Sequence, residues 1–288
     1  MSIPGPSRSL ALSRRRFLGG VAATVGLWGG SASGMAWGAA PARRLSADDP
    51  DLLSPFERLH LPVLRLPLVA SNGAKVPIVV EMAHPMEAGH YITSVQVSND
   101  RDPIPSKGVF HFTPANGQAY LSFQARMDQG ISEVSVTAEC SVHGRWASTR
   151  SINIPSGGGG CADSAPPPRR VRDDDIRPPA IRIPQLLKGG RLRPDEIVLV
   201  QLLTRHPSRT GLAIRDGRFV QQSEPFYLRE IELFYGEERV SRFEGTPALS
   251  DDPFISFPLR TRREGLLRAL LTDSRGQRFE AVQPIRFA

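Results

Sequence analysis

Two parts of the chain repeat one another, and this internal repeat constrains the fold more than any other feature. Val79–Gly89 reads VVEMAHPMEAG and Val200–Gly211 reads VQLLTRHPSRTG, so a His-Pro pair recurs at His84 and His206. Two later signatures return in the same order: Phe112-Thr113-Pro114-Ala115 with Thr246-Pro247-Ala248, and Tyr120-Leu121-Ser122-Phe123 with Phe254-Ile255-Ser256-Phe257. Similarity at a nearly constant offset marks a duplicated unit. The sequence therefore predicts two copies of one domain.

Each copy is predicted to consist of β-strands. Ser132–Val142 alternates between apolar and polar residues, and a period of two is typical of a strand with one buried face. Similar short runs, bounded by Asn-Gly, Pro and Gly turns, occur in both copies. They are Val76–Met82, Tyr91–Val97, Val109–Phe112, Tyr120–Ala125 and Thr149–Ile154, then Glu196–Thr204, Phe226–Tyr235, Glu238–Phe243, Phe254–Leu259, Leu266–Thr272 and Gln277–Phe287.

About seven short strands per ~100 residues indicate an immunoglobulin-like sandwich. The predicted fold class is all-β, with two immunoglobulin-like β-sandwich domains in tandem joined by a Gly/Pro-rich linker. We place the first domain at residues 47–154, the second at 180–288, and a stiffened polar linker at 162–179. Only Asp49–His60 is expected to be helical. We expect the two sandwiches to pack on each other.

The N-terminus carries a twin-arginine export motif. Ser13-Arg14-Arg15-Arg16-Phe17-Leu18 has the form S-R-R-x-F-L, and an apolar, charge-free stretch follows it to about Gly38. That stretch is too weakly hydrophobic for a permanent membrane span, and small residues at Ala36 and Gly38 suit cleavage before Ala39. Residues 1–38 are therefore predicted to be a twin-arginine signal peptide, and the mature protein to be periplasmic.

The charge of the chain argues against two classes of partner. Residues 1–38 contain four arginines and no acid, so the net charge of +7 falls to +3 in the mature protein. The remaining charges are of mixed sign and form no basic stripe. We therefore expect no nucleic-acid partner, and no membrane association after cleavage of the signal.

A glycine run ends in a single thiol directly after the first domain. Residues 155–161 read PSGGGGC, with Gly157, Gly158, Gly159 and Gly160 preceding Cys161. Because glycine accepts almost any backbone conformation, we predict a mobile arm, with Cys161 reaching roughly 23 Å from Ile154 when extended. An exposed thiol in an oxidising compartment is at risk of oxidation, so we expect this cysteine to have a use. An ordinary glycine-rich linker that happens to contain a cysteine is the alternative.

Cys140 and the repeated histidines need separate interpretations. Cys140 lies on the apolar face of Ser132–Val142, where an inert core thiol is the simplest interpretation. A disulfide with Cys161 is a second alternative. Cys140 and His143 also form C-x-x-H, a weak metal signal because no further ligand pair at metal spacing stands nearby. His84 and His206 recur at equivalent places, so we interpret both as strand-end structure.

The sequence gives little support to an enzyme. It contains no G-x-S-x-G, no Walker A loop and no H-E-x-x-H, and the glycine run follows a strand without opening a helix, unlike a dinucleotide site. A nucleophilic cysteine needs a histidine base, and the sequence places none beside Cys161. We expect no catalytic residue, no cofactor and no bound metal.

These features resemble the SoxYZ carrier family of bacterial thiosulfate oxidation. In that family an exported immunoglobulin-like subunit ends in a glycine-flanked cysteine, and a second such subunit accompanies it. Residues 47–161 look like the cysteine-bearing SoxY subunit. Residues 180–288 look like SoxZ, particularly through Thr204-Arg205-His206-Pro207, Pro247-Ala248 and Phe254–Leu259. The chain also resembles fused SoxYZ-like carriers associated with quinoprotein alcohol dehydrogenases.

The resemblance implies a function and a set of partners. Cys161 would carry a sulfur-linked substrate, such as a thiosulfate-derived group, between periplasmic sulfur-oxidation or quinoprotein dehydrogenase enzymes. The chain departs from the family pattern because Cys161 is internal and has glycines on one side only. A different class of function therefore stays open, namely a non-catalytic accessory protein of a quinoprotein (PQQ) alcohol dehydrogenase system.

Overall fold

The computed structural model describes residues 41–46, 50–163, 175–187 and 189–287. Residues 1–38, predicted as the signal peptide, and most of the predicted linker lie outside this part of the chain. The first copy contains eight strands: β1 (Arg43–Arg44), β2 (Val63–Arg65), β3 (Val76–Met82), β4 (Ile92–Asn99), β5 (Ser106–His111), β6 (Ala119–Ala125), β7 (Gly130–Cys140) and β8 (Gly144–Ile154). Short helical segments lie at η1 (Pro50–Leu52), α1 (Pro55–His60), η2 (Gly73–Lys75) and η3 (Pro114–Asn116).

The second copy repeats this plan with β-strands and one short helix. Its elements are β9 (Arg177–Arg182), α2 (Pro184–Leu187), β10 (Glu196–Arg205), β11 (Leu212–Arg215), β12 (Arg218–Gln221), β13 (Leu228–Tyr235), β14 (Glu238–Glu244), β15 (Phe254–Thr261), β16 (Gly265–Asp273) and β17 (Arg278–Ile285). The prediction of tandem immunoglobulin-like sandwiches is confirmed. The strands alternate as expected, since every second residue from Val134 to Cys140 is buried in β7.

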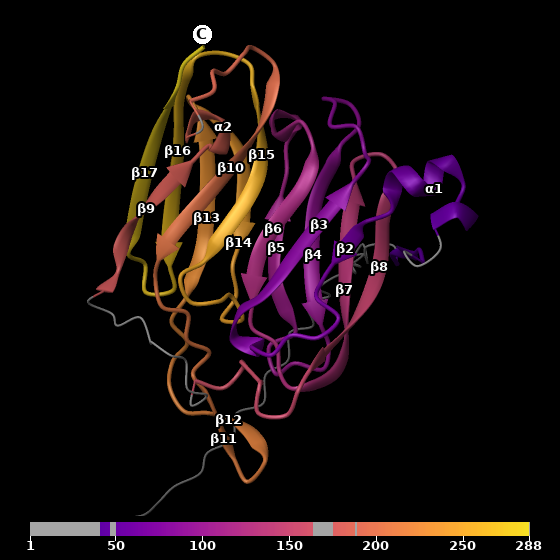
Figure 1. The fold of residues 1–288 in the computed structure, drawn as a ribbon, viewed down its shortest axis with the longest axis vertical. Coiled ribbons are helices and arrows are strands. Elements are labelled where there is room, and N and C mark those ends of the chain that lie inside the picture. The colour runs from indigo at the N-terminus through magenta and orange to yellow at the C-terminus, as the bar shows by residue number, and fades with distance from the viewer. Residues whose placement is uncertain (1–40, 47–49, 164–174, 188, 288) are drawn as a thin grey trace, which may run out of the picture. The chain divides into compact units, whose positions relative to one another are not determined.

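The two sandwiches are joined edge to edge, which differs from the expectation that they pack on each other. One sheet runs β1-β8-β7-β4-β5-β14-β13-β16-β17, and the other runs β2-β3-β6-β15-β10-β9. The crossing points are the antiparallel pairs β5–β14 and β6–β15. Figure 1 shows the strands of the two copies side by side along this boundary. Each sheet therefore continues from one copy into the other.

The repeated Thr-Pro-Ala signature explains how the copies hold one another. In each copy the threonine hydroxyl accepts a hydrogen bond from the alanine amide and donates one to a carbonyl of the other copy. Thr113 donates to the Val240 carbonyl oxygen at 2.7 Å, and Thr246 donates to the Ser106 carbonyl oxygen at 2.8 Å. Such a reciprocal exchange is what a two-fold-related interface requires. The motif was visible in the sequence, but its role between the copies was not.

Apolar packing also crosses the boundary. Phe243 of the second copy lies 5.5 Å from Phe123 and 6.2 Å from Phe110 of the first copy, measured between ring centroids. All three rings are buried in a single core cluster that contains residues of both copies. Buried aromatic pairs at these distances add to the stabilisation from apolar burial. The described residues from 41 to 287 accordingly belong to one compact unit.

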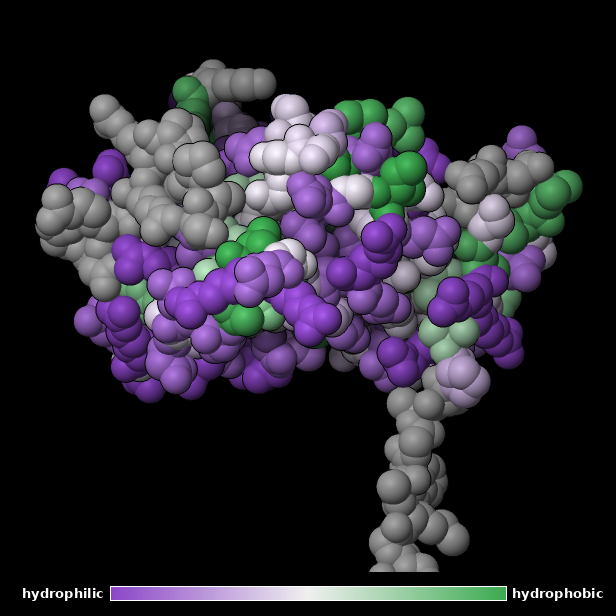
Figure 2. Space-filling view, turned by 90° about the horizontal axis from the view of Figure 1, so that it is seen from below, coloured by the Kyte–Doolittle hydropathy of each residue, from purple (hydrophilic) through white to green (hydrophobic). Residues whose placement is uncertain are grey.

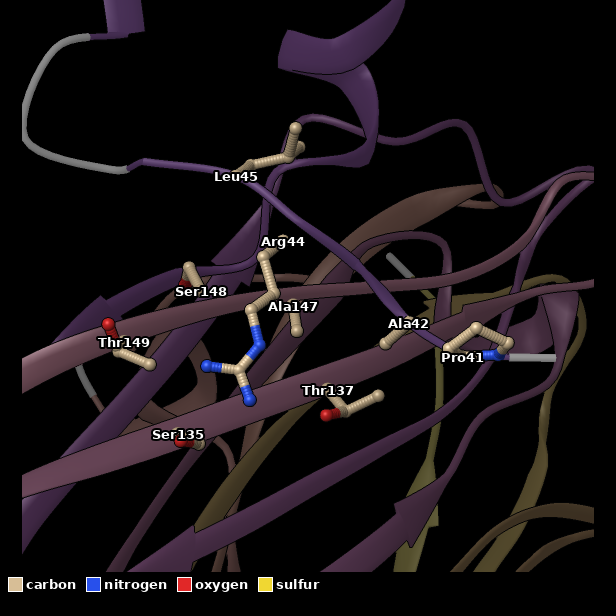
Figure 3. A pocket seen from close by; sticks show the side chains of 9 residues that line it. All are labelled: Pro41, Ala42, Arg44, Leu45, Ser135, Thr137, Ala147, Ser148 and Thr149. Atoms are coloured by element: carbon tan, nitrogen blue, oxygen red, sulfur yellow. The ribbon is translucent and has the colours of Figure 1, made fainter. Parts of the chain in front are cut away.

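The segment before the first long strand covers the outer edge of the larger sheet. β1 pairs in parallel with β8, with Arg43 opposite Trp146 and Arg44 opposite Ala147. Figure 3 shows the Arg44 side chain lying over β7 and β8, in a polar pocket of about 240 Å³ that also contains Ser135 and Thr137. The predicted helix Asp49–His60 is represented by η1 and α1. Ser54 caps the N-terminus of α1 through a capping box with Glu57.

Candidate functional site

The Cys161 segment is packed against the first sandwich, and the expectation of an exposed thiol on a mobile arm is wrong in this structure. The Cys161 side chain is 1% exposed. After β8 the chain turns back over the loop that contains η2. The Gly73 amide donates to the Gly158 carbonyl at 2.7 Å, and the Gly160 amide donates to the Met127 carbonyl at 2.9 Å. These main-chain hydrogen bonds hold the segment in place. We call residues 155–161 the docked arm.

The glycines of the docked arm are required by close packing. A Cβ added at Gly160 would overlap the Ala74 amide nitrogen, and one at Gly159 would lie 2.6 Å from an Asp128 carboxylate oxygen. Gly157 differs, because its surroundings are open but its φ is +83°, a conformation that favours glycine. The absence of side chains, which we interpreted as freedom to move, is thus also what lets the backbone approach its neighbours.

Two side chains fasten the arm to the rest of the molecule. Arg126, at the end of β6, donates to the Gly160 carbonyl at 3.0 Å and to the Ser208 carbonyl at 2.6 Å, and it pairs with Asp251 at 3.1 Å. Thr210 donates its hydroxyl proton to the Cys161 carbonyl at 2.7 Å. Ser208, Thr210 and Asp251 belong to the second copy. The thiol of the first copy is therefore held partly by the second.

The surroundings of the thiol disfavour its ionisation. Burial raises the pKa of Cys161 to about 12, and the nearby Asp102 carboxylate adds to the effect. Asp102 forms a buried ion pair with Lys107, with 2.6 Å between Oδ2 and Nζ. The Lys107 ammonium partly offsets the effect of the carboxylate. Since the thiolate is the reactive form, the docked arm keeps Cys161 protonated and chemically quiet.

The docked arm lies at the end of the molecule that carries β11 and β12. The Asp163 amide donates to the Leu212 carbonyl at 2.8 Å, and the Asp163 carboxylate accepts from the amides of Thr210 and Gly211. Figure 2 looks onto this end and shows a mainly hydrophilic face with small, separate hydrophobic groups. A depression of about 460 Å³ beside Asp163 and Gly211 opens here. A partner could approach the arm from this side.

Cys140 lies at the other end of the first sandwich. It ends β7, whereas the docked arm lies beside Gln129 at the start of that strand. Eleven residues of strand separate the two ends, which corresponds to roughly 30 Å at the rise of a β-strand. The alternative of a Cys140–Cys161 disulfide is therefore wrong in this fold, and both cysteines are free. Cys140 is buried, as expected for an inward-facing strand residue.

The two His-Pro pairs share one local structure, as predicted. The Nδ1 atom of His84 lies 2.6 Å from the Pro85 carbonyl oxygen, and that of His206 lies 2.6 Å from the Pro207 carbonyl oxygen. The far nitrogen of each ring meets a different neighbour. His206 Nε2 lies 3.7 Å from an Asp273 carboxylate oxygen, whereas His84 Nε2 lies 3.5 Å from the Cys140 sulfur. Strand-end structure is thus only part of the role of His84.

Cys140 and His143 lie beside three further histidines. The expectation that no further metal ligands stand near the C-x-x-H pair is therefore wrong. His60, His84, His90 and Cys140 bring one ligand atom each to within 4.8 Å of one another. Burial lowers the pKa of His84 to about 4 and also lowers the pKa of His60, so both rings are neutral at neutral pH. The sequence signal that could have shown this was the pair His84 and His90 together with C-x-x-H.

Other residues of the docked arm's surroundings could not be found from the sequence. Asp102 and Lys107 are buried charges that pair with each other, and Arg126 is a buried charge whose partner Asp251 is distant along the chain. Charged side chains are almost never fully buried unless they are paired, but a sequence does not show which of its charges are buried.

Among the described residues, no helix is long and apolar enough to span a membrane.

Comparison with solved structures finds several superoxide reductases at low identity. The superoxide reductase (neelaredoxin) from Ignicoccus hospitalis is 19% identical, with 38% of this chain and 93% of that chain covered and a TM-score of 0.33. The superoxide reductase from Nanoarchaeum equitans is 17% identical. That match covers 33% of this chain and 94% of the reductase, with a TM-score of 0.29. At these scores the likenesses do not bear on function. No curated protein matches the sequence.

Two family matches cover both copies in order. Sulfur oxidation protein SoxY matches residues 60–161, and sulphur oxidation protein SoxZ matches residues 189–284. The SoxY match ends at Cys161 itself. The two families support a carrier role in sulfur oxidation. Members of these families are non-catalytic and work together with sulfur-oxidation enzymes. The chain therefore belongs to the SoxY and SoxZ families, as a fusion of the two sulfur-oxidation carrier subunits in a single polypeptide.

Proposed function

We propose that the protein is a periplasmic carrier that holds a sulfur-linked substrate on Cys161 and presents it to partner enzymes. The observation that carries this proposal is the position of Cys161. It is the last residue of the SoxY match, it follows four glycines, and the hydrogen bonds that dock its segment use the segment's own main-chain groups. Such bonds can be exchanged for bonds to water or to a partner when the arm leaves its place.

The docked arm gives the carrier a resting state. With Cys161 protonated and 1% exposed, the thiol is protected from oxidants between transfers. A partner that binds beside β11 and β12 would release the arm by competing for the contacts of Arg126 and Thr210. Release returns the thiol to water and lowers its pKa towards the ordinary value, so that thiolate forms where the partner acts.

The loading step can be written with balanced electrons. The Cys161 thiol and a substrate thiol each lose a proton and together lose two electrons as a sulfur–sulfur bond forms. A partner oxidoreductase must accept those two electrons. For unloading, a partner reductase supplies two electrons and solvent supplies two protons, so that the sulfur–sulfur bond breaks and the Cys161 thiol and the substrate thiol are both regenerated. The carrier itself supplies the sulfur and the moving segment, and the catalytic groups belong to the partners.

The twin-arginine signal and the partner enzymes are part of the same proposal. Residues 1–38 would direct the folded protein to the periplasm, and residues 162–179 would tether the docked arm to the SoxZ-like half while it moves. The burial of Cys161 favours one alternative, a non-catalytic accessory protein of a quinoprotein (PQQ) alcohol dehydrogenase in which the arm stays docked and the thiol is incidental.

Intact mass separates these two functions. Protein purified from the native periplasm without reductant should carry an adduct that reductant removes, and the Cys161→Ser variant should carry none. The matched control is Cys140→Ala, which should keep the adduct. In a strain that depends on the protein, Cys161→Ser should lose substrate oxidation. If Cys161→Ser supports oxidation as well as the parent does, the carrier function is wrong.

A further inference from the structure

Five potential metal ligands meet at the end of the first sandwich opposite the docked arm. His60 ends α1, and His84 and His90 lie in the connection from β3 to β4. Cys140 ends β7, and His143 lies in the turn between β7 and β8. We call these five residues the histidine cluster. Figure 1 shows the α1 helix at the upper right, far from β11 and β12 at the bottom.

The ligand atoms of the histidine cluster are spaced as they would be around one ion. Those of His60, His84, His90 and Cys140 lie within 4.8 Å of one another. The Nδ1 atom of His143 lies 3.1 Å from His60 Nε2 and 3.7 Å from the Cys140 sulfur. Metal–nitrogen bonds of about 2.1 Å and metal–sulfur bonds of about 2.3 Å place neighbouring ligand atoms roughly 3–4.5 Å apart. A single ion can therefore touch His60, His84, His90 and Cys140, with His143 beside two of these ligands.

The rings are oriented by hydrogen bonds that point away from the centre. The His60 Nδ1 donates to the Phe56 carbonyl at 2.8 Å, and the His84 Nδ1 donates to the Pro85 carbonyl at 2.6 Å. Because a carbonyl can only accept, both Nδ1 atoms carry the proton and both Nε2 atoms present a lone pair inwards. Metal-binding histidines are held in this way by their second nitrogen.

His90 adds an observation of a different kind. Its Nε2 atom is buried and has no hydrogen-bond partner among the described residues. Most buried polar side-chain atoms in proteins have a partner, so an unpartnered ring nitrogen on a residue grouped with three other potential ligands calls for an explanation. A bound ion would satisfy this nitrogen together with the inward Nε2 atoms of His60 and His84.

Aromatic packing makes the site rigid. The Trp146 ring stacks on the His60 ring at 4.6 Å between centroids, and Phe56 meets the His143 ring edge-on at 4.9 Å. Trp146 is 1% exposed. Ligands held by packed neighbours lose little conformational freedom when they bind, which favours tight binding. His143 is exposed and His90 is half-buried, so one side of the cluster faces solvent.

We propose that the histidine cluster binds one divalent first-row transition-metal ion. Three imidazoles and one thiolate form a donor set typical of such ions, and it differs from the oxygen donors that Mg²⁺ and Ca²⁺ require. The His143 imidazole beside His60 and Cys140 offers a further nitrogen to an ion that accepts more than four ligands. The solvent-facing side then leaves a position for a small exchangeable ligand. The Cys140 thiol loses its proton to solvent on binding.

The second copy serves as an internal comparison. Its equivalent histidine, His206, meets the Asp273 carboxylate in place of a thiol, and both side chains are 0% exposed. Among the described residues, the histidine cluster is the one group of three or more His, Cys, Asp or Glu side chains spaced to hold an ion. The metal site therefore belongs to the SoxY-like half alone and is independent of Cys161.

Cobalt(II) binding to the metal-free full-length protein tests this proposal. We expect one Co²⁺ per chain, with a thiolate-to-cobalt charge-transfer band that saturates at a ratio of one. X-ray absorption of the cobalt and iron(II) forms should show nitrogen ligands and a single sulfur. Zn²⁺ and Fe²⁺ should displace or exclude Co²⁺. The charge-transfer band should vanish in Cys140→Ser, and His143→Gln, an exposed turn position, should weaken binding at least about 10-fold.

Two controls lie outside the histidine cluster. His111→Gln changes an exposed histidine paired with Glu244, and Cys161→Ser changes the other thiol. Both should bind Co²⁺ as the parent does, so loss of the carrier function and loss of the metal site can be told apart. Binding of Co²⁺ without a thiolate band, or binding unaffected by both Cys140→Ser and His143→Gln in variants with parental circular dichroism, would overturn the proposal.

Discussion

The two ends of the first sandwich each bury a cysteine, but they do so in opposite chemical settings. Cys161 is enclosed by backbone, and its burial, with a smaller effect from the nearby Asp102 carboxylate, raises its pKa to about 12. Cys140 is enclosed by imidazole nitrogens, with His84 Nε2 3.5 Å away and His143 Nδ1 3.7 Å away. The first setting keeps a thiol protonated, and the second places a thiol among ring nitrogens that are potential metal ligands. Burial alone thus does not define what a cysteine does.

The largest expected effect concerns the reactivity of Cys161. A pKa near 12 makes the thiolate about 1,000-fold scarcer at pH 8 than in an unperturbed cysteine. Alkylation of Cys161 in the folded protein should therefore be slower by about that factor. Its rate should rise about tenfold per pH unit while the fold persists, because the thiolate fraction grows as pH approaches the pKa. Peptide mass spectrometry after timed alkylation measures this rate. Native protein in which Cys161 reacts like a free thiol would contradict the docked arm.

The next effect concerns the clamp on the arm. Arg126→Met removes the bonds to the Gly160 and Ser208 carbonyls and leaves Asp251 without its guanidinium. We expect the free energy of unfolding to fall by about 2–4 kcal/mol, measured by urea denaturation. The matched control is Arg65→Met. Arg65 forms an exposed ion pair with Glu81, and losing this pair should lower the free energy of unfolding by less than about 1 kcal/mol. Equal losses in the two variants would remove the special role of Arg126.

A smaller effect is expected from the packing of the glycines. Gly160→Ala forces a Cβ against the Ala74 amide, which should destabilise the docked arm by about 1–3 kcal/mol. Cys161 alkylation should then accelerate about 10-fold to 100-fold, while the metal affinity of the histidine cluster stays unchanged. Gly157→Asn is the control, because its surroundings are open and asparagine tolerates a positive φ. A similar acceleration in both variants would show that flexibility, and not close packing, governs exposure of the thiol.

The smallest effect is expected from cutting the chain between the halves. A specific protease site in place of Pro166-Pro167-Pro168 should allow complete cleavage, after which the fragments should elute together because both sheets continue across the boundary. Cys161 alkylation should change by less than about threefold, since Thr210 and Arg126 still hold the arm. Size-exclusion chromatography and timed labelling measure the two outcomes. Separation of the fragments would refute the edge-to-edge joining.

The sequence predicted the strands well and their assembly poorly. Alternation in β7 and the short apolar runs of the other strands report burial of one face, and this pattern is local. The joining of β5 to β14 depends on which edges meet, and edge pairing leaves no period in the sequence. The single helix before β2 was found from its acids and is shorter than predicted.

The two sites differ in how much of each could be predicted. Cys161 was found because a glycine run is conspicuous, but its exposure was wrong because the same residues that permit motion also permit the closest packing. The histidine cluster was missed because its five ligands come from four separate segments. Only the spacings of Cys140 with His143 and of His84 with His90 are local enough to be seen, and neither spacing is distinctive by itself.

The edge-to-edge joining has a consequence for solubility. Each copy, taken alone, would end in two strands with unpaired backbone groups, β5 and β6 on one side and β14 and β15 on the other. Bare strand edges of this kind recruit further strands from other molecules and lead to aggregation. In the fused chain the two copies are present in equal amounts and are linked covalently. Each strand edge can therefore pair with the edge of the other copy during folding, without a second molecule. A SoxY-like half produced by itself should therefore be the aggregation-prone product, and the full chain the well-behaved one.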